Sequence, residues 1–264
     1  MPNKYLARED APFGSEVWDK LDEVMKTAAK SQLVGRRLLD VEGPYGLGLK
    51  AVPLPDPEME DDSGITLGGV LPLAWIEKVF TLGVRDLAAY ERDKVVLSTS
   101  RVAEAAVEAA RLEDELIFHG AGGMDGLMTV EGANQVALSG WEEVGTAADE
   151  IIGAITTLDE AGFHGPYALA LAPGRYNALF RLYGQQNRSE LEHIRMMVTA
   201  GVYKAPILDD GGVLVATGRL SATIVLGQDM TVGFIGPVGP RIEMTISESL
   251  ALRIRRPNAI CVLA

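Results

Sequence analysis

The chain has 264 residues, of which 47% are hydrophobic and 23% are charged, so it is long enough to build one large core or two modest ones. Its 37 acidic and 24 basic residues give a net charge of −13, which opposes binding to nucleic acid or to an anionic membrane surface. The single cysteine, Cys261, excludes an internal disulfide and any multi-cysteine metal site.

The first ten residues show no secretion signal, because a basic start followed by an apolar run is missing. No apolar run in the chain approaches the ~18 residues that a membrane-spanning helix needs. A single thiol also fits a reducing compartment. We therefore expect a cytoplasmic protein that does not insert into membranes.

The first predicted element is an amphipathic helix that begins near Ser15 and ends before Gly35. Serine is a good N-cap, glycine commonly follows a helix end, and apolar residues recur at helical spacing: Trp18, Leu21, Val24, Met25, Ala28, Ala29 and Leu33. The helix therefore offers an apolar face, either to the core of its own chain or to a partner. A short strand from Arg36 to Val41 is predicted next, and it leads into a tight glycine-proline turn.

A long hairpin arm is predicted between residues 49 and 82. Leu49 to Leu54 and Leu71 to Leu82 have strand-like compositions, and the acidic, proline-bearing run from Pro55 to Gly64 has the composition of an exposed tip. An isolated hairpin is only marginally stable in water. We therefore expect this arm to lie on a neighbouring subunit.

Three helices are predicted after the arm. The first runs from Val84 to Arg92 and the second from Thr99 to His119, where apolar or small residues recur every three or four positions. The glycine-rich run Gly120 to Gly126 ends the second helix and lacks the Lys-Ser/Thr pair of a phosphate-binding loop. The third helix is predicted from about Gly145 to Ala161.

The rest of the chain turns from helix to strand. A buried strand is predicted within Gly165 to Gly174, where Pro173 suits the first turn of another helix. A polar loop, Tyr183 to Glu190, precedes a helix that ends near Ala200. Further strands are predicted at Val213–Thr217, Ala222–Leu226, Thr231–Ile235 and Arg241–Arg255. Because helices and strands do not alternate regularly, the predicted fold class is α+β.

Few residues point to catalysis or to metal binding. Glu115 and His119 share a helical face, but a metal site needs more ligands, and a histidine that interacts with the end of the helix dipole explains the pair as well. No G-x-S-x-G elbow is present. Cys261 lies in the apolar run Ala259 to Ala264, so we expect it to be buried. We predict neither a catalytic residue nor a metal site.

Five segments taken together resemble the encapsulins, a family of bacterial and archaeal shell proteins. They are GRRLLDVEGPYG, LPLAWIEKVFTL, EDELIFHG, GPYALAL and LGQDMTVGF, which begin at residues 35, 71, 113, 165 and 226. Each segment alone is weak evidence, but the five follow one another in the family's order across most of the chain.

The resemblance implies the major-capsid fold of Hong Kong 97-type tailed phages. It implies a peripheral domain built from residues 1–48, 83–133 and 228–264, with the N-terminal helix facing the interior of the shell. Residues 49–82 are expected to form the extended loop of this fold. Residues 134–227 are expected to form its axial domain.

The resemblance also implies a non-enzymatic shell protein that self-assembles into an icosahedral nanocompartment of about sixty copies. Such a shell encloses a cargo enzyme, which docks through a C-terminal targeting peptide. The expected cargo is a ferritin-like protein for iron storage or oxidative-stress defence. Two other functions stay open on the sequence, a hydrolase or peptidase and the major capsid protein of a tailed phage. No metal, cofactor, nucleic acid or membrane partner is expected.

The family's docking surface maps onto six residues of this chain: Leu33, Arg36, Asp40, Asp229, Thr231 and Ile246. An apolar floor with an arginine and carboxylates suits a short peptide, although Arg36 and Asp40 are equally explained as a pair on one face of the predicted strand. The family's pore loop maps onto Gln185, Gln186, Asn187 and Arg188, which predict a polar rather than an acidic pore. Some encapsulins bind flavin through a tryptophan, but the matching residue here is Arg85, so flavin is not predicted.

Overall fold

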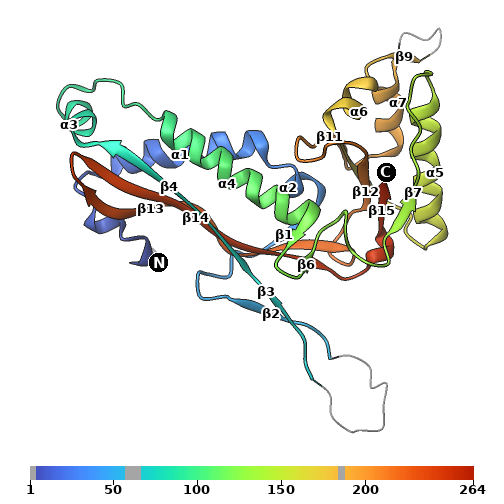
Figure 1. Ribbon diagram of the computed structural model, residues 1–264, viewed down its shortest axis with the longest axis horizontal. Coiled ribbons are helices and arrows are strands. Elements are labelled where there is room, and N and C mark those ends of the chain that lie inside the picture. Colours follow the sequence, from blue (N-terminus) through green and yellow to red (C-terminus); the bar gives the residue numbers. More distant parts are fainter. Residues whose placement is uncertain (1–3, 57–66, 184–187) are drawn as a thin grey trace. The chain divides into compact units, whose positions relative to one another are not determined.

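The structure is a computed structural model, and it describes residues 4–56, 67–183 and 188–264 (Figure 1). These residues divide into two compact units. Unit 1 comprises the described residues of 1–33, 43–113 and 226–251, and unit 2 comprises those of 34–42, 114–225 and 252–264. One long helix, α4 (Ser100–His119), and two long strands, β13 (Ala222–Val238) and β14 (Arg241–Ile254), contribute residues to both units.

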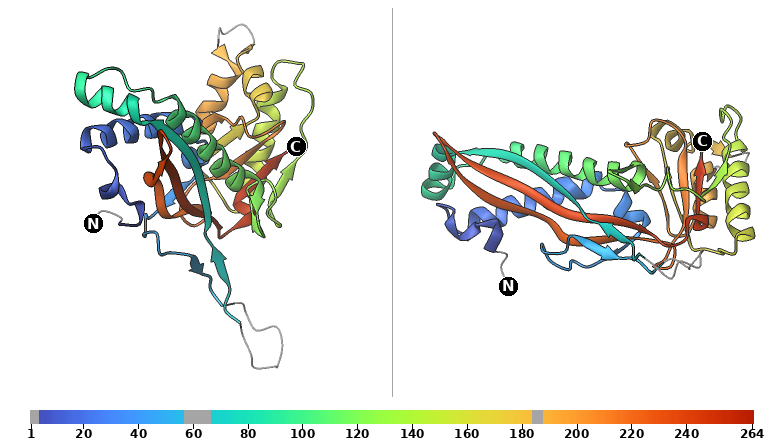
Figure 2. Two further views of the ribbon diagram at one scale, coloured as in Figure 1. Left: turned by 60° about the vertical axis from the view of Figure 1, so that its left-hand side comes forward. Right: turned by 60° about the horizontal axis from the view of Figure 1, so that its bottom comes forward.

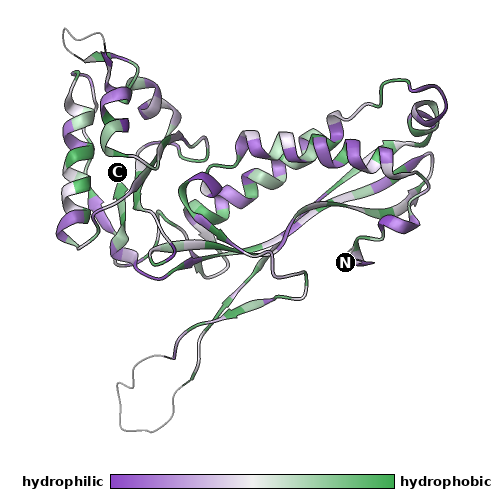
Figure 3. Ribbon diagram, turned by 180° about the vertical axis from the view of Figure 1, so that it is seen from behind, coloured by the Kyte–Doolittle hydropathy of each residue, from purple (hydrophilic) through white to green (hydrophobic). Residues whose placement is uncertain are grey.

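The N-terminal helix, α1 (Ser15–Gln32), forms where its sequence predicts, and its apolar stripe is buried within the chain. Leu21 is fully buried and Met25 is 2% exposed. Figure 3 shows hydrophilic and hydrophobic residues following one another along α1 and α4, as expected of helices with one buried face. The stripe therefore packs in the core of its own chain. This is one of the two alternatives that the sequence left open, the other being contact with a partner.

A four-stranded sheet has the order β1-β13-β14-β4. The short strand β1 (Asp40–Glu42) pairs in parallel with residues 223–225 of β13, whereas β4 (Ala74–Gly83) pairs antiparallel with β14 along its whole length. Burial alternates along β4, where Ile76 and Phe80 are buried and Trp75 and Val79 are about half exposed. Since neighbouring strand residues point to opposite faces, only one face of β4 packs on the core.

The predicted arm is present as a pair of short strands in unit 1. β2 (Ala51–Pro53) and β3 (Val70–Pro72) pair antiparallel, with Val52 opposite Leu71. The left view in Figure 2 shows these strands leading away from the sheet. Most of the predicted tip, Pro55 to Gly64, lies outside the described residues.

Three predicted helices match the structure to within one residue at each end. They are α3 (Val84–Asp93), α4 and α5 (Thr146–Glu160). The match follows from local signals, because apolar periodicity and flanking glycines are read within one turn of the chain.

Unit 2 contains a five-stranded sheet of order β11-β8-β12-β15-β7. Every residue of the three inner strands is buried, and Cys261 is fully buried as predicted. The helices of this unit include α5, α6 (Pro173–Ala178) and α7 (Glu190–Met197). The strands are β7 (Asn134–Val136), β8 (Tyr167–Leu171), β11 (Gly201–Lys204), β12 (Gly212–Ala216) and β15 (Ile260–Leu263).

The remaining short elements connect the larger ones. They are the 3-10 turns η1 (Lys4–Leu6), η2 (Arg8–Asp10) and η3 (Pro257–Ala259), the helical turn α2 (Gly35–Leu38), and the strands β5 (Gly120–Ala121), β6 (Met124–Asp125), β9 (Leu182–Tyr183) and β10 (Arg188–Ser189).

The predicted strand from Arg36 to Val41 is wrong in its first half, which forms α2. The carboxylate of Asp114 accepts the backbone N–H groups of Val34 and Gly35 at 2.9 Å each and so caps the start of this turn. A β-carbon on Gly35 would lie 2.6 Å from Ile117 Cδ1, so the turn packs directly on α4 within unit 2. These long-range contacts override the local strand preference.

The two strands predicted at residues 222–226 and 231–235 are one continuous strand, β13. The strands β7, β11 and β15 were not predicted at all. β15 pairs with β12 and β7 inside unit 2, so residues 252–264 do not group with the rest of the segments expected to form the peripheral domain. Residues 114–133 also belong to unit 2. Strand pairing between distant segments, which local sequence does not encode, places residues 260–263 in unit 2.

Candidate functional site

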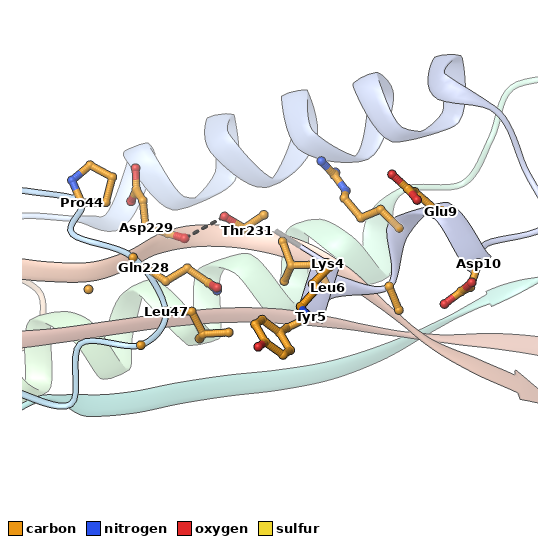
Figure 4. A pocket seen from close by; sticks show the side chains of 15 residues that line it. Lys4, Tyr5, Leu6, Glu9, Asp10, Pro44, Leu47, Gln228, Asp229 and Thr231 are labelled. Carbon is orange, nitrogen blue, oxygen red and sulfur yellow. Dashed lines mark hydrogen bonds between the residues drawn. The ribbon is translucent and has the colours of Figure 1, made fainter. Parts of the chain in front are cut away.

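A hollow of about 800 Å³ lies within unit 1, and we call it the β13 hollow. It is lined by residues from three stretches of chain, within 4–10, 44–48 and 227–231. Figure 4 shows their side chains gathered around it. Ligand pockets in proteins have volumes of roughly 300–1,000 Å³, so the β13 hollow is large enough to hold part of a partner molecule.

Residues 4–10 form one wall of the hollow, and we call them the N-terminal wall. Leu6 anchors this wall, because it is only 9% exposed. Its Cδ2 and its backbone oxygen both lie 3.3 Å from the position that a β-carbon on Gly233 would occupy. The glycine in β13 therefore leaves the space into which Leu6 packs.

Arg8 joins the N-terminal wall to α1. Its Nη2 donates to the carboxylate of Asp22 at 2.6 Å, and its guanidinium lies 4.1 Å from the centre of the Trp18 ring. Phe13 contacts the same ring system, with 5.1 Å between ring centres. An ion pair and a cation–π contact on partly exposed groups contribute modestly to stability, yet together they fix where the wall lies.

The glycine-proline turn supplies the second wall. Gly43 has a φ of 109°, and a β-carbon there would lie 2.5 Å from the backbone oxygen of Leu226, so this position requires glycine. The N–H groups of Tyr45 and Gly46 donate to the oxygens of Leu226 and Gly227 at 3.0 and 2.6 Å. These bonds explain why the GPYG and LGQD segments, far apart in the sequence, belong to one site.

Gln228 lies at the floor of the hollow within a polar network. It is 7% exposed, and its backbone N–H donates to Ser249 Oγ at 2.9 Å. Its side-chain Nε2 donates to the backbone oxygen and the hydroxyl of Ser247 at 3.1 and 3.0 Å. Buried polar groups that are bonded in this way hold a fixed position, so the floor is rigid.

Asp229 and Thr231 lie beside this floor on β13, and both line the hollow. Asp229 Oδ1 accepts the backbone N–H of Met230 at 2.9 Å. Thr231 Oγ1 donates to the backbone oxygen of Asp229 at 2.7 Å, as Figure 4 shows. Both side chains therefore bond to the main chain of their own strand.

The charged groups around the hollow are mainly acidic. Glu9, Asp10 and Asp229 line it, against Lys4 and an Arg8 whose charge is balanced by Asp22. Glu9 and Asp10 are exposed and form no ion pair with any other residue that the structure describes. A partner with a basic group is therefore electrostatically favoured at this rim.

The structure distributes the six predicted docking residues over both units. Asp229 and Thr231 line the β13 hollow, while Leu33 is 7% exposed at the end of α1. Ile246 is fully buried in β14 and has no surface to offer a peptide. Its expected role as a contact residue is therefore corrected to support of the sheet from within.

Arg36 and Asp40 belong to unit 2. Arg36 is half-buried in α2, and Asp40 is exposed at the start of β1, opposite Thr223 of β13. The suggestion that these two residues pair on one face of a strand required both to be in that strand. Because Arg36 lies in a helical turn, that basis for the pairing is wrong.

Of the predicted pore-loop residues, Gln185, Gln186 and Asn187 lie outside the described residues. Arg188 is exposed in β10, where it pairs opposite Tyr183 of β9. The helix α7 that follows is capped on both sides of its first turn: Glu192 N–H donates to Ser189 Oγ at 3.3 Å, and Ser189 N–H donates to Glu192 Oε2 at 2.8 Å. This capping box fixes where the loop rejoins unit 2.

Across residues 4–56, 67–183 and 188–264, no three His, Cys, Asp or Glu side chains come close enough to hold a metal ion. His119 Nε2 lies 3.4 Å from the backbone oxygen of Ile207. No helix in the described part of the chain is both long and apolar enough to span a bilayer.

Sequence reasoning missed the N-terminal wall. Leu6 is a lone apolar residue with no periodic companions, so nothing local marks it as buried. The available signal was Gly233, because a glycine inside a strand often marks a close approach by other backbone. That signal shows that something packs on β13 but not which segment.

The chain has clear relatives. Residues 3–251 match the family model Linocin_M18, described as "Encapsulating protein for peroxidase". The chain is 34% identical over 279 residues to the type 1 encapsulin shell protein EncA of Myxococcus xanthus, covering all of this chain and 97% of that protein. The chain belongs to the encapsulin family.

Two other encapsulin relatives are fusion proteins. The diheme-cytochrome-encapsulin shell fusion protein of Kuenenia stuttgartiensis is 30% identical, over 95% of this chain and 73% of its own length. The ferritin-like-encapsulin shell fusion protein of Pyrococcus furiosus is 25% identical, over 78% of this chain and 56% of its own length.

Solved structures show the same fold. The virus-like particle from Pyrococcus furiosus matches with a TM-score of 0.76 at 21% identity, over 94% of this chain and all of that one. The capsid of Myoviridae phage XM1 matches with a TM-score of 0.60 at 15% identity, over 85% and 88% of the two chains. The encapsulin described here therefore has the Hong Kong 97-type capsid fold. It is a structural shell protein that forms a capsid-like compartment, not an enzyme.

Proposed function

We propose that this encapsulin assembles into an icosahedral nanocompartment of about sixty copies and encloses a cargo protein that docks at the β13 hollow. The observation that carries the proposal is the hollow itself. It is preformed, it is lined by three separate stretches, and it contains Asp229 and Thr231, onto which the family's docking surface maps. A shell protein has no substrate of its own, so a hollow of this size suits a docked partner.

The cargo that we propose is a ferritin-like protein that stores iron or defends against oxidative stress in the cytoplasm. The Pyrococcus relative supports this class, because its name joins a ferritin-like part to the shell. Charge supports it too, since copies with a net charge of −13 attract cations such as iron into a closed space. The competing cargoes are a peroxidase, after the family description, and a cytochrome, after the Kuenenia fusion.

Purification of the shell together with its natural cargo tests the proposal. Size-exclusion chromatography and negative-stain microscopy should show uniform particles in the megadalton range, and mass spectrometry should identify a ferritin-like protein inside them. A monomer or dimer over a range of salt and pH contradicts the shell. Uniform particles that contain a peroxidase or a cytochrome support the proposed shell but refute the proposed cargo.

Charge reversal at the predicted docking residues tests where the cargo binds. Arg36→Glu and Asp40→Lys should each leave particles assembled but largely empty, because a reversed charge opposes the complementary group of the peptide. Arg92→Glu is the matched control, since Arg92 is 81% exposed on α3 of unit 1. The cargo-to-shell ratio is read from gel densitometry. Normal loading in both variants contradicts a docking role for Arg36 and Asp40, neither of which lines the β13 hollow.

We also propose that the shell binds no flavin. Arg85 is exposed on α3, where flavin-binding members of the family have a tryptophan. The absorbance and fluorescence of denatured particles should show no flavin. Arg85→Trp is the comparison variant, because it restores the aromatic side chain that stacks on flavin. Flavin released from the unaltered shell contradicts the proposal.

A further inference from the structure

A second hollow, of about 210 Å³, lies within unit 1 at the end of β4. We call it the Thr81 pocket. It is lined by the last residues of β4, the first turn of α3, the segment before α4, and the starts of α4 and β14. Its charged side chains are Asp86, Arg101 and Arg241, none of which lines the β13 hollow. The pocket is therefore separate from the proposed docking site.

Two guanidinium groups meet in this pocket at one oxygen. Nη1 of Arg101 and Nη1 of Arg241 both donate to Thr81 Oγ1, at 3.5 and 3.2 Å. The arginines come from α4 and β14, so the fold brings the two charges together. No carboxylate in the described part of the chain forms an ion pair with either. Like charges held close to each other repel, and a bound anion offsets that repulsion.

The start of α4 adds to this positive charge. The helix has 20 residues and no acidic residue in its first turn. The N–H groups at the start of a long helix have no acceptor within the helix and carry a partial positive charge. Ser98 lines the pocket just before this start, and its Oγ lies 3.5 Å from Ser100 Oγ. The helix start and the hydroxyl groups thus supply further donors beside the two arginines.

One carboxylate, that of Asp86, faces the same pocket. Its Oδ2 lies 2.5 Å from the position that a β-carbon on Gly83 would occupy, so the glycine leaves room for it. A carboxylate repels an oxyanion that has lost all its protons, but it accepts a hydrogen bond from one that keeps a proton. At neutral pH hydrogen phosphate keeps a proton, whereas sulfate has none and a phosphate monoester loses its last one with a pKa of about 6.

We infer that the Thr81 pocket binds one inorganic hydrogen phosphate ion, with Arg101 and Arg241 donating to its oxygens and Asp86 accepting its proton. The volume supports a small ion, because 210 Å³ is below the roughly 300–1,000 Å³ of pockets that hold organic ligands. All three charged side chains are exposed, so the ion enters from solvent. This inference goes beyond the proposed function and does not depend on the cargo.

Equilibrium dialysis of assembled shells against radiolabelled inorganic phosphate tests the site. Saturable binding of one phosphate per chain is expected. Arg101→Gln and Arg241→Gln should each weaken binding at least about tenfold, because each removes a charge-assisted hydrogen bond. Arg111→Gln is the matched control, an exposed arginine of α4 that does not line the pocket, and it should bind phosphate like the unaltered shell.

Two results of the dialysis overturn the inference. The first is the absence of saturable binding to the unaltered shell. The second is equal weakening in all three variants, which would mean that phosphate responds only to the overall charge. Both pocket arginines are exposed, so their variants should still assemble, and size-exclusion chromatography of each variant verifies this.

Competition with unlabelled anions tests the choice of ligand. Sulfate and adenosine monophosphate should each need concentrations at least about tenfold higher than phosphate to displace the label, because Asp86 repels an anion without a proton. Asp86→Asn should let sulfate compete as well as phosphate does. Sulfate that competes equally in the unaltered shell, or that stays excluded in Asp86→Asn, contradicts the assigned role of Asp86. Adenosine monophosphate that competes better than phosphate would assign the pocket to a phosphate ester and overturn the inference.

Discussion

Replacement of Leu6 by alanine tests whether one buried side chain holds the N-terminal wall on β13. Leu6 is 9% exposed and packs above Gly233. The substitution removes about three carbon groups, and at ~0.8 kcal/mol for each buried group the wall loses about 2 kcal/mol of its contact with β13. Because ~1.4 kcal/mol corresponds to a factor of ten, the detached wall becomes about thirtyfold more populated.

Hydrogen exchange of the amides in residues 4–10 of assembled shells measures this population. Exchange should be about thirtyfold faster in Leu6→Ala. It should be unchanged in the control Tyr5→Ala, because Tyr5 is 72% exposed. The melting temperature of the particle should change little, since release of the wall is local. Equal exchange in Leu6→Ala and the unaltered chain, or equal acceleration in both variants, refutes the reasoning.

Three further predictions concern unit 2. Hydrogen bonds from Arg175 lower the pKa of Asp210 from its ordinary 3.8 to about 2. The stability that this pair contributes is therefore present above about pH 4 and is lost as the pH falls toward 2. Melting curves of Asp210→Asn should lack this acid dependence. Burial raises the pKa of the Cys261 thiol to about 11. A thiol reagent should therefore label Cys261 only after unfolding. Rapid labelling of folded particles contradicts this prediction. Asp114→Ala leaves two N–H groups at the start of α2 without their acceptor. In urea titrations it should lower the free energy of unfolding by about 2–3 kcal/mol. A loss below ~0.5 kcal/mol contradicts the capping role.

The sequence by itself determined the elements whose signals are local. The helices α1, α3, α4 and α5 were predicted to within a few residues, because apolar residues at helical spacing and glycines at the ends act within one or two turns. The ordered family segments determined more, namely the capsid fold and the role as a shell protein. They also directed attention to Asp229 and Thr231, which line the β13 hollow.

Tertiary structure decided the features that depend on contacts between distant residues. Residues 35–38 form a helical turn rather than a strand because Asp114 caps it, and β15 joins the sheet of unit 2 because β12 and β7 flank it. Neither partner can be identified from the neighbouring sequence.

The β13 hollow itself belongs to this second group. It exists because Leu6 packs where Gly233 has no side chain and because the turn after Gly43 bonds to the start of the same strand segment. Each of these residues is ordinary in its own stretch of sequence. Gly233 indicates from the sequence that some segment packs on β13, but only the folded chain shows which backbones approach each other there.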